Sequence, residues 1–153
     1  MIEDTMNRKT LNSLSKKQKI ALIVFSAIGF VVAYSLSSSL FSTSVEDEIG
    51  KIAVEMSKSC PKMMDEFTRL DSVVSPKNSR NIKYCYTLSG INEDSLDLNA
   101  VHSNLREVII TGIKTSKDMK YLKKHDVVFD YLYFGKNKKK LMEIKILPTE
   151  YKE

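Results

Sequence analysis

The segment with the clearest chemical character is Thr68-Arg69-Leu70-Asp71. It opens a run of residues, 68–74, that favours a β-strand, and side chains two positions apart on a strand point to the same face. Arg69 and Asp71 are therefore expected to lie side by side, where a guanidinium and a carboxylate pair with each other or bracket a ligand. We interpret Thr68, Arg69 and Asp71 as candidate contacts for a partner. The simpler alternative is a salt bridge on the surface of a sheet.

The chain has two cysteines, Cys60 and Cys85. In an oxidising compartment they can form a disulfide, and closing a loop of about 25 residues would stabilise the domain by about 3 kcal/mol. The strand pattern argues the other way. Cys85 alternates with Tyr84 and Tyr86 and so lies on the opposite face from them, whereas Cys60 falls on the apolar stripe of a predicted helix. The sequence leaves both a Cys60–Cys85 bridge and two separate thiols open.

No arrangement of residues predicts a catalytic, metal or cofactor site. A cysteine nucleophile needs a positioned base, and the two histidines are His102, beside the apolar stripe of a predicted helix, and His125, in a lysine-rich turn. The histidines, cysteines and carboxylates share no spacing typical of metal ligands. We therefore expect a protein that is not an enzyme and holds neither a cofactor nor a metal.

A basic cluster lies between two predicted strands near the carboxyl end, at Lys136, Lys138, Lys139 and Lys140. Four like charges within five residues are typical of a solvated turn. For a domain held near a membrane, they are also candidates for contact with anionic headgroups or cell-wall polymer, at about 1 kcal/mol per lysine.

The run Ile20–Phe41 carries no charge and follows the basic residues Lys16, Lys17 and Lys19. At about 1.5 Å per residue, its 22 residues extend about 33 Å as a helix, close to the thickness of a bilayer core. The basic flank predicts a cytoplasmic arm over 1–19, a transmembrane helix over 20–41 and an exported domain over 44–153. The alternative is a cleaved signal peptide.

The basic charge is concentrated in the amino-terminal part of the chain. Residues 1–44 hold five of the 24 basic and two of the 19 acidic side chains, so they account for +3 of the net charge of +5. The domain is left nearly neutral, which does not indicate a nucleic-acid partner.

Hydrophobic periodicity predicts an α+β domain of two layers. An antiparallel four-stranded sheet is expected to carry both main helices on one face, in the order αββα(α)ββ, with Tyr84, Tyr86, Tyr131 and Tyr133 in the core or in cross-strand pairs. Ser44 and Asp97 are the predicted helix caps, and 62–66 is a connection. The predicted helices are 44–59, 98–113 and 116–124, and the predicted strands are 68–74, 80–88, 127–134 and 141–147.

Three segments resemble a set of small, uncharacterised bacterial proteins that are exported or membrane-anchored. The segments are Pro61–Asp71, with its Pro-x-Met-x-Asp and Thr-Arg-Leu-Asp elements, the strand Tyr84-Cys85-Tyr86-Thr87-Leu88, and Phe129–Tyr133. The resemblance covers roughly Glu55 to Lys145. Its members carry two cysteines, one before the last helix-to-strand connection and one near the carboxyl end, where this chain has none. The resemblance implies the fold and no activity.

The expected function is that of a single-pass protein of the bacterial inner membrane whose periplasmic or extracellular domain binds a protein partner. The setting would be a secretion or pilus system, or an exclusion factor; a homo-oligomer is compatible with the sequence. The alternative is a periplasmic protein released by signal cleavage, with a cysteine-dependent or small-ligand-binding activity.

The predicted topology is tested by fusing alkaline phosphatase after Phe41. Because this enzyme requires disulfides that form outside the cytoplasm, the fusion should be active, and a fusion after Lys19 should be inactive. An inactive Phe41 fusion would place the domain in the cytoplasm.

Overall fold

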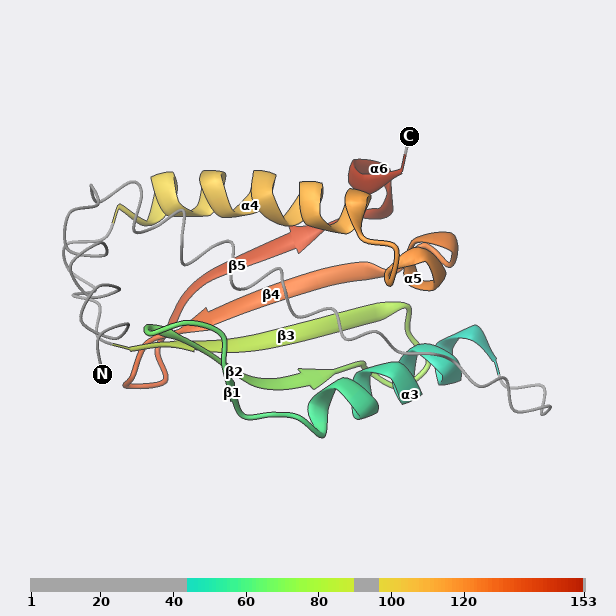
Figure 1. Ribbon diagram of the computed structural model, residues 1–153, viewed down its shortest axis with the longest axis horizontal. Coiled ribbons are helices and arrows are strands. Elements are labelled where there is room, and N and C mark those ends of the chain that lie inside the picture. Colours follow the sequence, from blue (N-terminus) through green and yellow to red (C-terminus); the bar gives the residue numbers. More distant parts are fainter. Residues whose placement is uncertain (1–43, 90–96, 153) are drawn as a thin grey trace, which may run out of the picture.

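The computed structural model describes residues 44–89 and 97–152, which form a sheet with helices packed against it (Figure 1). The predicted arm, 1–19, and the predicted transmembrane helix, 20–41, lie outside these residues. Within the two described ranges, no helix is both long and apolar enough to cross a membrane. The elements in chain order are α3 (Val45–Ser57), β1 (Lys62–Met63), β2 (Thr68–Val74), β3 (Asn81–Leu88), α4 (Leu98–Thr115), α5 (Lys120–Lys124), β4 (Val128–Phe134), β5 (Lys140–Ile146) and α6 (Pro148–Tyr151).

The sheet has five strands in the order β1-β2-β3-β4-β5. Neighbouring strands are antiparallel except for β3 and β4, which run parallel. The predicted α+β class is confirmed, whereas the prediction of a four-stranded antiparallel sheet is wrong.

The parallel pair follows from the long connection between β3 and β4. Parallel strands need a crossover of a dozen or more residues, commonly a helix, and α4 carries the chain back to the end of the sheet where β3 began. The fifth strand, β1, has two residues and lies in the segment predicted to be a connection, 62–66. A strand of two residues is too short to show the alternation of apolar and polar residues by which strands are recognised in a sequence.

Helices α3 and α4 begin at the side-chain caps that the sequence predicts. Ser44 Oγ accepts a hydrogen bond from the Asp47 amide at 3.1 Å, and Asp97 accepts from the amides of the second and third residues of α4. Helix α4 continues to Thr115, past its predicted end at Ile113.

Four tyrosines form the centre of the core. The parallel register places Tyr84 beside Tyr131 and Tyr86 beside Tyr133, and in each pair the rings stack with centroids 5.0 Å apart. All four side chains are buried. The prediction of core aromatics in cross-strand pairs is therefore confirmed.

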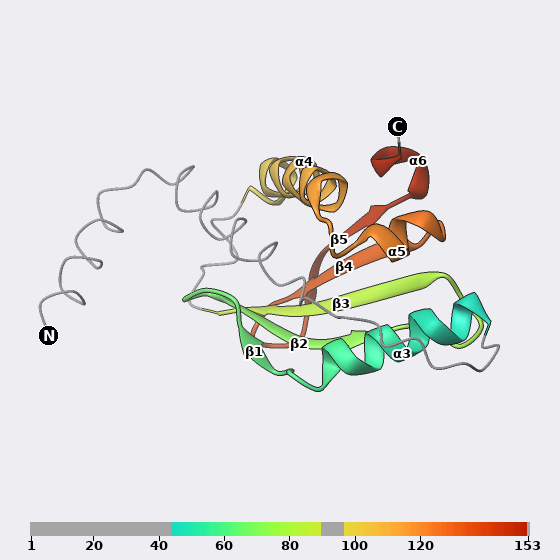
Figure 2. The same ribbon diagram turned by 45° about the vertical axis from the view of Figure 1, so that its right-hand side comes forward.

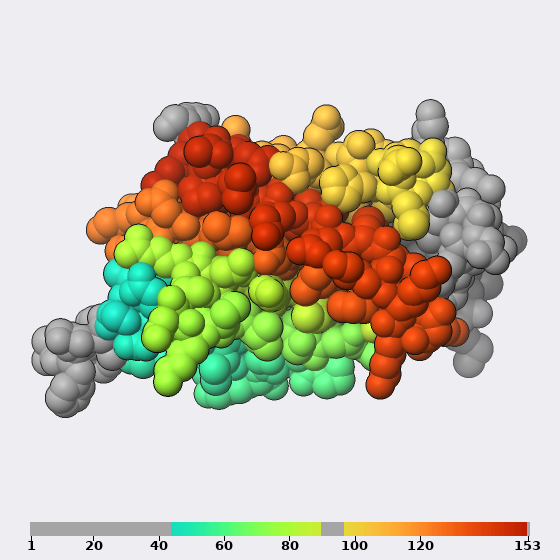
Figure 3. Space-filling model, turned by 180° about the vertical axis from the view of Figure 1, so that it is seen from behind, coloured from blue at the N-terminus to red at the C-terminus, as the bar shows by residue number. Residues whose placement is uncertain are grey.

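The helices pack against one face of the sheet. Strand β3 alternates strictly between buried and half-buried residues, because its tyrosine side meets the core and its other side does not. Figure 2 shows α3 and α4 flanking the strands, and Figure 3 shows the reverse side, where strands occupy the middle of the view. We call this reverse side, which carries Arg69, Cys85, Thr87 and Phe134, the open face.

Alkaline pH should unfold the domain cooperatively. Burial raises the pKa of Tyr84, Tyr86, Tyr131 and Tyr133 above its ordinary value, so the stability that their neutral hydroxyls provide is complete below about pH 10 and is lost as the pH rises further. Tyrosinate absorbance at 295 nm and far-ultraviolet circular dichroism should change together. Tyr131→Phe should move the transition to higher pH. Titration of all the tyrosines near pH 10 without loss of structure would contradict this account.

Candidate functional site

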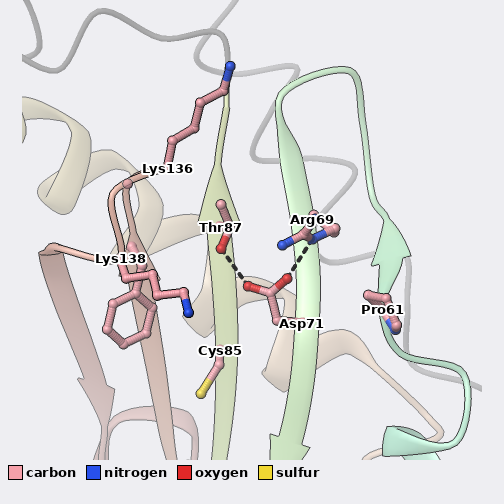
Figure 4. Close-up of a pocket in the computed structure, with 9 residues that line it drawn as sticks. Pro61, Arg69, Asp71, Cys85, Thr87, Lys136 and Lys138 are labelled. Carbon is pink, nitrogen blue, oxygen red and sulfur yellow. Dashed lines mark hydrogen bonds and ion pairs between the residues drawn. The ribbon is translucent and has the colours of Figure 1, made fainter.

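The open face contains a pocket of about 590 Å³ at the end of β3 where Thr87 lies (Figure 4). Its volume is within the ~300–1,000 Å³ range of ligand pockets. The lining residues come from the residue before β1, from β2, β3, the end of β4 and the β4–β5 turn: Pro61, Arg69, Asp71, Cys85, Thr87, Phe134, Gly135, Lys136 and Lys138. Three groups singled out in the sequence therefore meet in one place: the Arg69/Asp71 pair, Cys85 and part of the lysine cluster.

Asp71 is held by two partners. Its Oδ1 accepts a hydrogen bond from Arg69 Nε at 2.5 Å, and its Oδ2 accepts one from Thr87 Oγ1 at 2.5 Å. The ion pair is partly solvated, with the Arg69 side chain 48% and the Asp71 side chain 28% exposed. Such a pair contributes little to stability, so its main effect is to fix the direction of both charged groups.

A β-bulge in β2 places Asp71 in this position. The pairing with β3 shifts between Leu70 and Ser72, which lets both Leu70 and Val73 face the core although they are three positions apart. Regular alternation would have put Val73 on the open face. The spacing of these two apolar residues is the sequence signal for the bulge.

The β4–β5 turn brings Lys136 and Lys138 to the pocket. The amide of Lys138 donates to the Gly135 carbonyl at 2.9 Å, and the Gly135 amide donates to the Lys139 carbonyl at 2.9 Å. Lys138 has a positive φ of 63°. The other two lysines of the predicted cluster do not line the pocket: Lys139 is exposed, and Lys140 Nζ pairs with Glu143 at 2.9 Å.

Thr68 does not belong to the site. It lies on the covered face, where it is 1% exposed. Arg69, its neighbour on the strand, points the other way because side chains alternate along a strand. The grouping of Thr68 with Arg69 and Asp71 as partner contacts is corrected accordingly, and Thr87 is the threonine that joins Asp71. The contact of Thr87 with Asp71 depends on the β2–β3 register, which the sequence pattern did not specify.

Cys60 and Cys85 are both free, so the bridge that the sequence left open is not formed. Cys60 packs against the core and donates through Sγ to the Met56 carbonyl at 3.8 Å, whereas Cys85 lines the pocket on the open face. Burial, and secondarily the charge of Asp71, raises the pKa of the Cys60 thiol. Cys60 is therefore unsuited to act as a thiolate nucleophile.

The two histidines lie away from the pocket. His102 Nε2 is 3.2 Å from the Glu143 carbonyl of the edge strand β5, and the ring of His125 contacts Tyr121. Arg106 of α4 also donates to a β5 carbonyl, that of Lys145, at 2.9 Å. These α4 side chains occupy outward carbonyls of the edge strand and protect it from pairing with another strand. Among the described residues, no cluster of histidine, cysteine and carboxylate could hold a metal ion.

The pocket lies at the end of the domain opposite the start of α3. Glu46, in the first turn of α3, pairs at 2.8 Å with Arg80, the residue before β3, and this hydrogen bond lowers the pKa of Glu46. Thr87 is seven residues further along the strand, about 23 Å at ~3.3 Å per residue. Figure 1 shows the start of α3 and the β4–β5 turn at opposite ends of the sheet.

A family model described as "Domain of unknown function (DUF8479)" matches residues 44–142. The chain belongs to this family. The matched range contains the whole pocket and ends before α6. No curated protein sequence matches the chain.

Two solved structures share the fold. The first is a "putative secreted protein" from Pseudomonas aeruginosa, with a TM-score of 0.61 and 12% identity, covering 76% of this chain and 100% of its own. The second is the type II secretion system pilotin AspS from Vibrio cholerae, with a TM-score of 0.51 and 9% identity, covering 69% of this chain and 91% of its own. At these identities the similarity is one of fold.

Substitutions at two neighbouring residues of β2 should show that the pocket residue contributes little to stability and the core residue contributes much. Arg69→Ala should change the free energy of unfolding by less than about 1 kcal/mol, because its ion pair is partly solvated. Leu70→Ala, one residue away and buried, should cost about 2–5 kcal/mol. Urea-induced unfolding measures both. A large loss of unfolding free energy in Arg69→Ala would mean that the Arg69–Asp71 ion pair stabilises the fold.

Proposed function

We propose that this chain is a membrane-tethered interaction module of the bacterial cell envelope, which binds a protein partner through the open face of its sheet. It acts by binding and not by turnover. The observation that carries the proposal is the pocket around Arg69, Asp71 and Thr87, a preformed cavity on a sheet face that the described helices leave uncovered. The shared fold with a type II secretion pilotin supports a setting in envelope assembly or secretion.

The position of the pocket supports a partner rather than the lipid surface. If residues 20–41 anchor the chain, Ser44 follows within a few residues, and the end of the domain at which α3 begins lies next to the bilayer. Charges act over about 8 Å at physiological ionic strength. Lys136 and Lys138, at the far end of β3, would then lie beyond the field of the headgroups and face a partner in the envelope.

A second candidate is a periplasmic protein, released by cleavage near Ala33–Ser39, that binds a small ligand. The cavity volume and the free thiol of Cys85 in its lining favour this candidate over a flat interaction surface. A cysteine-dependent reaction gains no support, because neither histidine lines the pocket that holds Cys85.

Site-specific photocrosslinking in the native membrane tests the binding-module proposal. Benzoylphenylalanine is placed at Phe134 on the open face, and as controls at Val54 of α3, which is 63% exposed, and at the exposed Glu107 of α4. Phe134 should give a discrete adduct that mass spectrometry identifies as an envelope protein, and Arg69→Ala should reduce its yield several-fold. Adducts only from the helix positions, or none at all, would refute the proposal.

A further inference from the structure

The pocket carries an excess of positive charge. Asp71 compensates Arg69 through the ion pair at 2.5 Å, and no interaction with another described residue pairs the ammonium groups of Lys136 and Lys138. Further along the open face the lysines of β5 have carboxylates beside them. Lys145 Nζ lies 3.8 Å from Asp130 Oδ1, and Lys140 Nζ lies 2.9 Å from Glu143. Lys136 and Lys138 at the pocket have no such partner among the described residues.

The ion pair with Asp71 orients the guanidinium of Arg69 toward the same pocket. Only its Nε donates to Asp71, so the terminal nitrogens have no hydrogen-bond partner among the described residues and are directed along the sheet surface. A guanidinium fixed by one carboxylate and still carrying unused donors is suited to bind a second one. Phe134 and Pro61 provide apolar lining beside these donors.

We infer that the pocket is a carboxylate-recognition site that takes an acidic side chain or a chain-terminal carboxylate from an extended protein segment. Lys138 and Arg69 hold the carboxylate, Lys136 adds positive charge at the rim of the pocket, and Phe134 contacts the apolar part of the segment. The inference rests on the proposed function and adds the chemistry of the partner. A protein segment is favoured over a lipid headgroup because the lining is partly apolar and the pocket is distant from the start of α3.

Cys85 serves as a native reporter for the charge of the pocket. In the full-length Cys60→Ala protein, the rate of Cys85 modification is compared for two methanethiosulfonates, one bearing a sulfonate and one a trimethylammonium group. The ratio of the anionic to the cationic rate is divided by the ratio that the two reagents give with free 2-mercaptoethanol. This normalised ratio should be about five or more at low salt and should fall as salt is added.

Matched lysine variants assign that preference to the pocket. Lys136→Gln/Lys138→Gln should remove most of it, whereas Lys139→Gln, in the same turn but outside the pocket, should reduce it only slightly. A preference for the cationic reagent, or a loss of preference in Lys139→Gln as large as in the double variant, would overturn the inference.

Protection of Cys85 from neutral methyl methanethiosulfonate tests the kind of ligand. Acetyl-Phe-Glu-Glu-Phe-amide at millimolar concentration should slow the reaction, and acetyl-Phe-Gln-Gln-Phe-amide should not. Equal or absent protection, or protection only by phosphatidylglycerol vesicles, would overturn the assignment to an acidic protein segment.

The experiments distinguish failure of the proposed envelope partner from failure of the proposed carboxylate site. Anion preference without an adduct at Phe134 would remove the envelope partner and keep the carboxylate site. An adduct at Phe134 whose yield is the same in Lys136→Gln/Lys138→Gln would keep the partner and remove the carboxylate site.

Discussion

The parallel register between β3 and β4 is the constraint on which the domain depends. It aligns Tyr84 with Tyr131 and Tyr86 with Tyr133, so that two stacked pairs occupy the centre of the core. Because side chains alternate along a strand, burying the tyrosines turns the residues between and beyond them to the other face. The same register thus builds the core and places Cys85, Thr87 and Phe134 around one pocket.

Two local irregularities complete the site that the register begins. The bulge between Leu70 and Ser72 keeps the apolar side of β2 in the core while Asp71 turns toward Thr87. The turn after β4, with Lys138 in the left-handed region, brings its lysines to the pocket. The charged part of the site therefore depends on irregular backbone at the ends of a regular sheet, where substitution costs the core little.

Much of the fold was predictable from local patterns, and the site was predictable only in part. Strand 68–74 and the caps at Ser44 and Asp97 follow from alternation and side-chain chemistry over a few residues. The direction of β4 relative to β3 depends on the crossover through α4, which the prediction of an antiparallel four-stranded sheet did not take into account. Arg69 and Asp71 were found from their spacing, but Thr87 and Phe134 join them through pairings between strands distant in sequence.

If the open face binds a protein of the envelope, as proposed, amide hydrogen exchange should reveal the contact. Exchange of the full-length protein is measured by mass spectrometry in its native membrane and again after purification in detergent. Peptides covering β3 and the β4–β5 turn should be protected in the membrane and lose that protection on purification, while α4 should be unchanged. Equal exchange of the open face in both preparations, or a change confined to α4, would contradict the proposed contact.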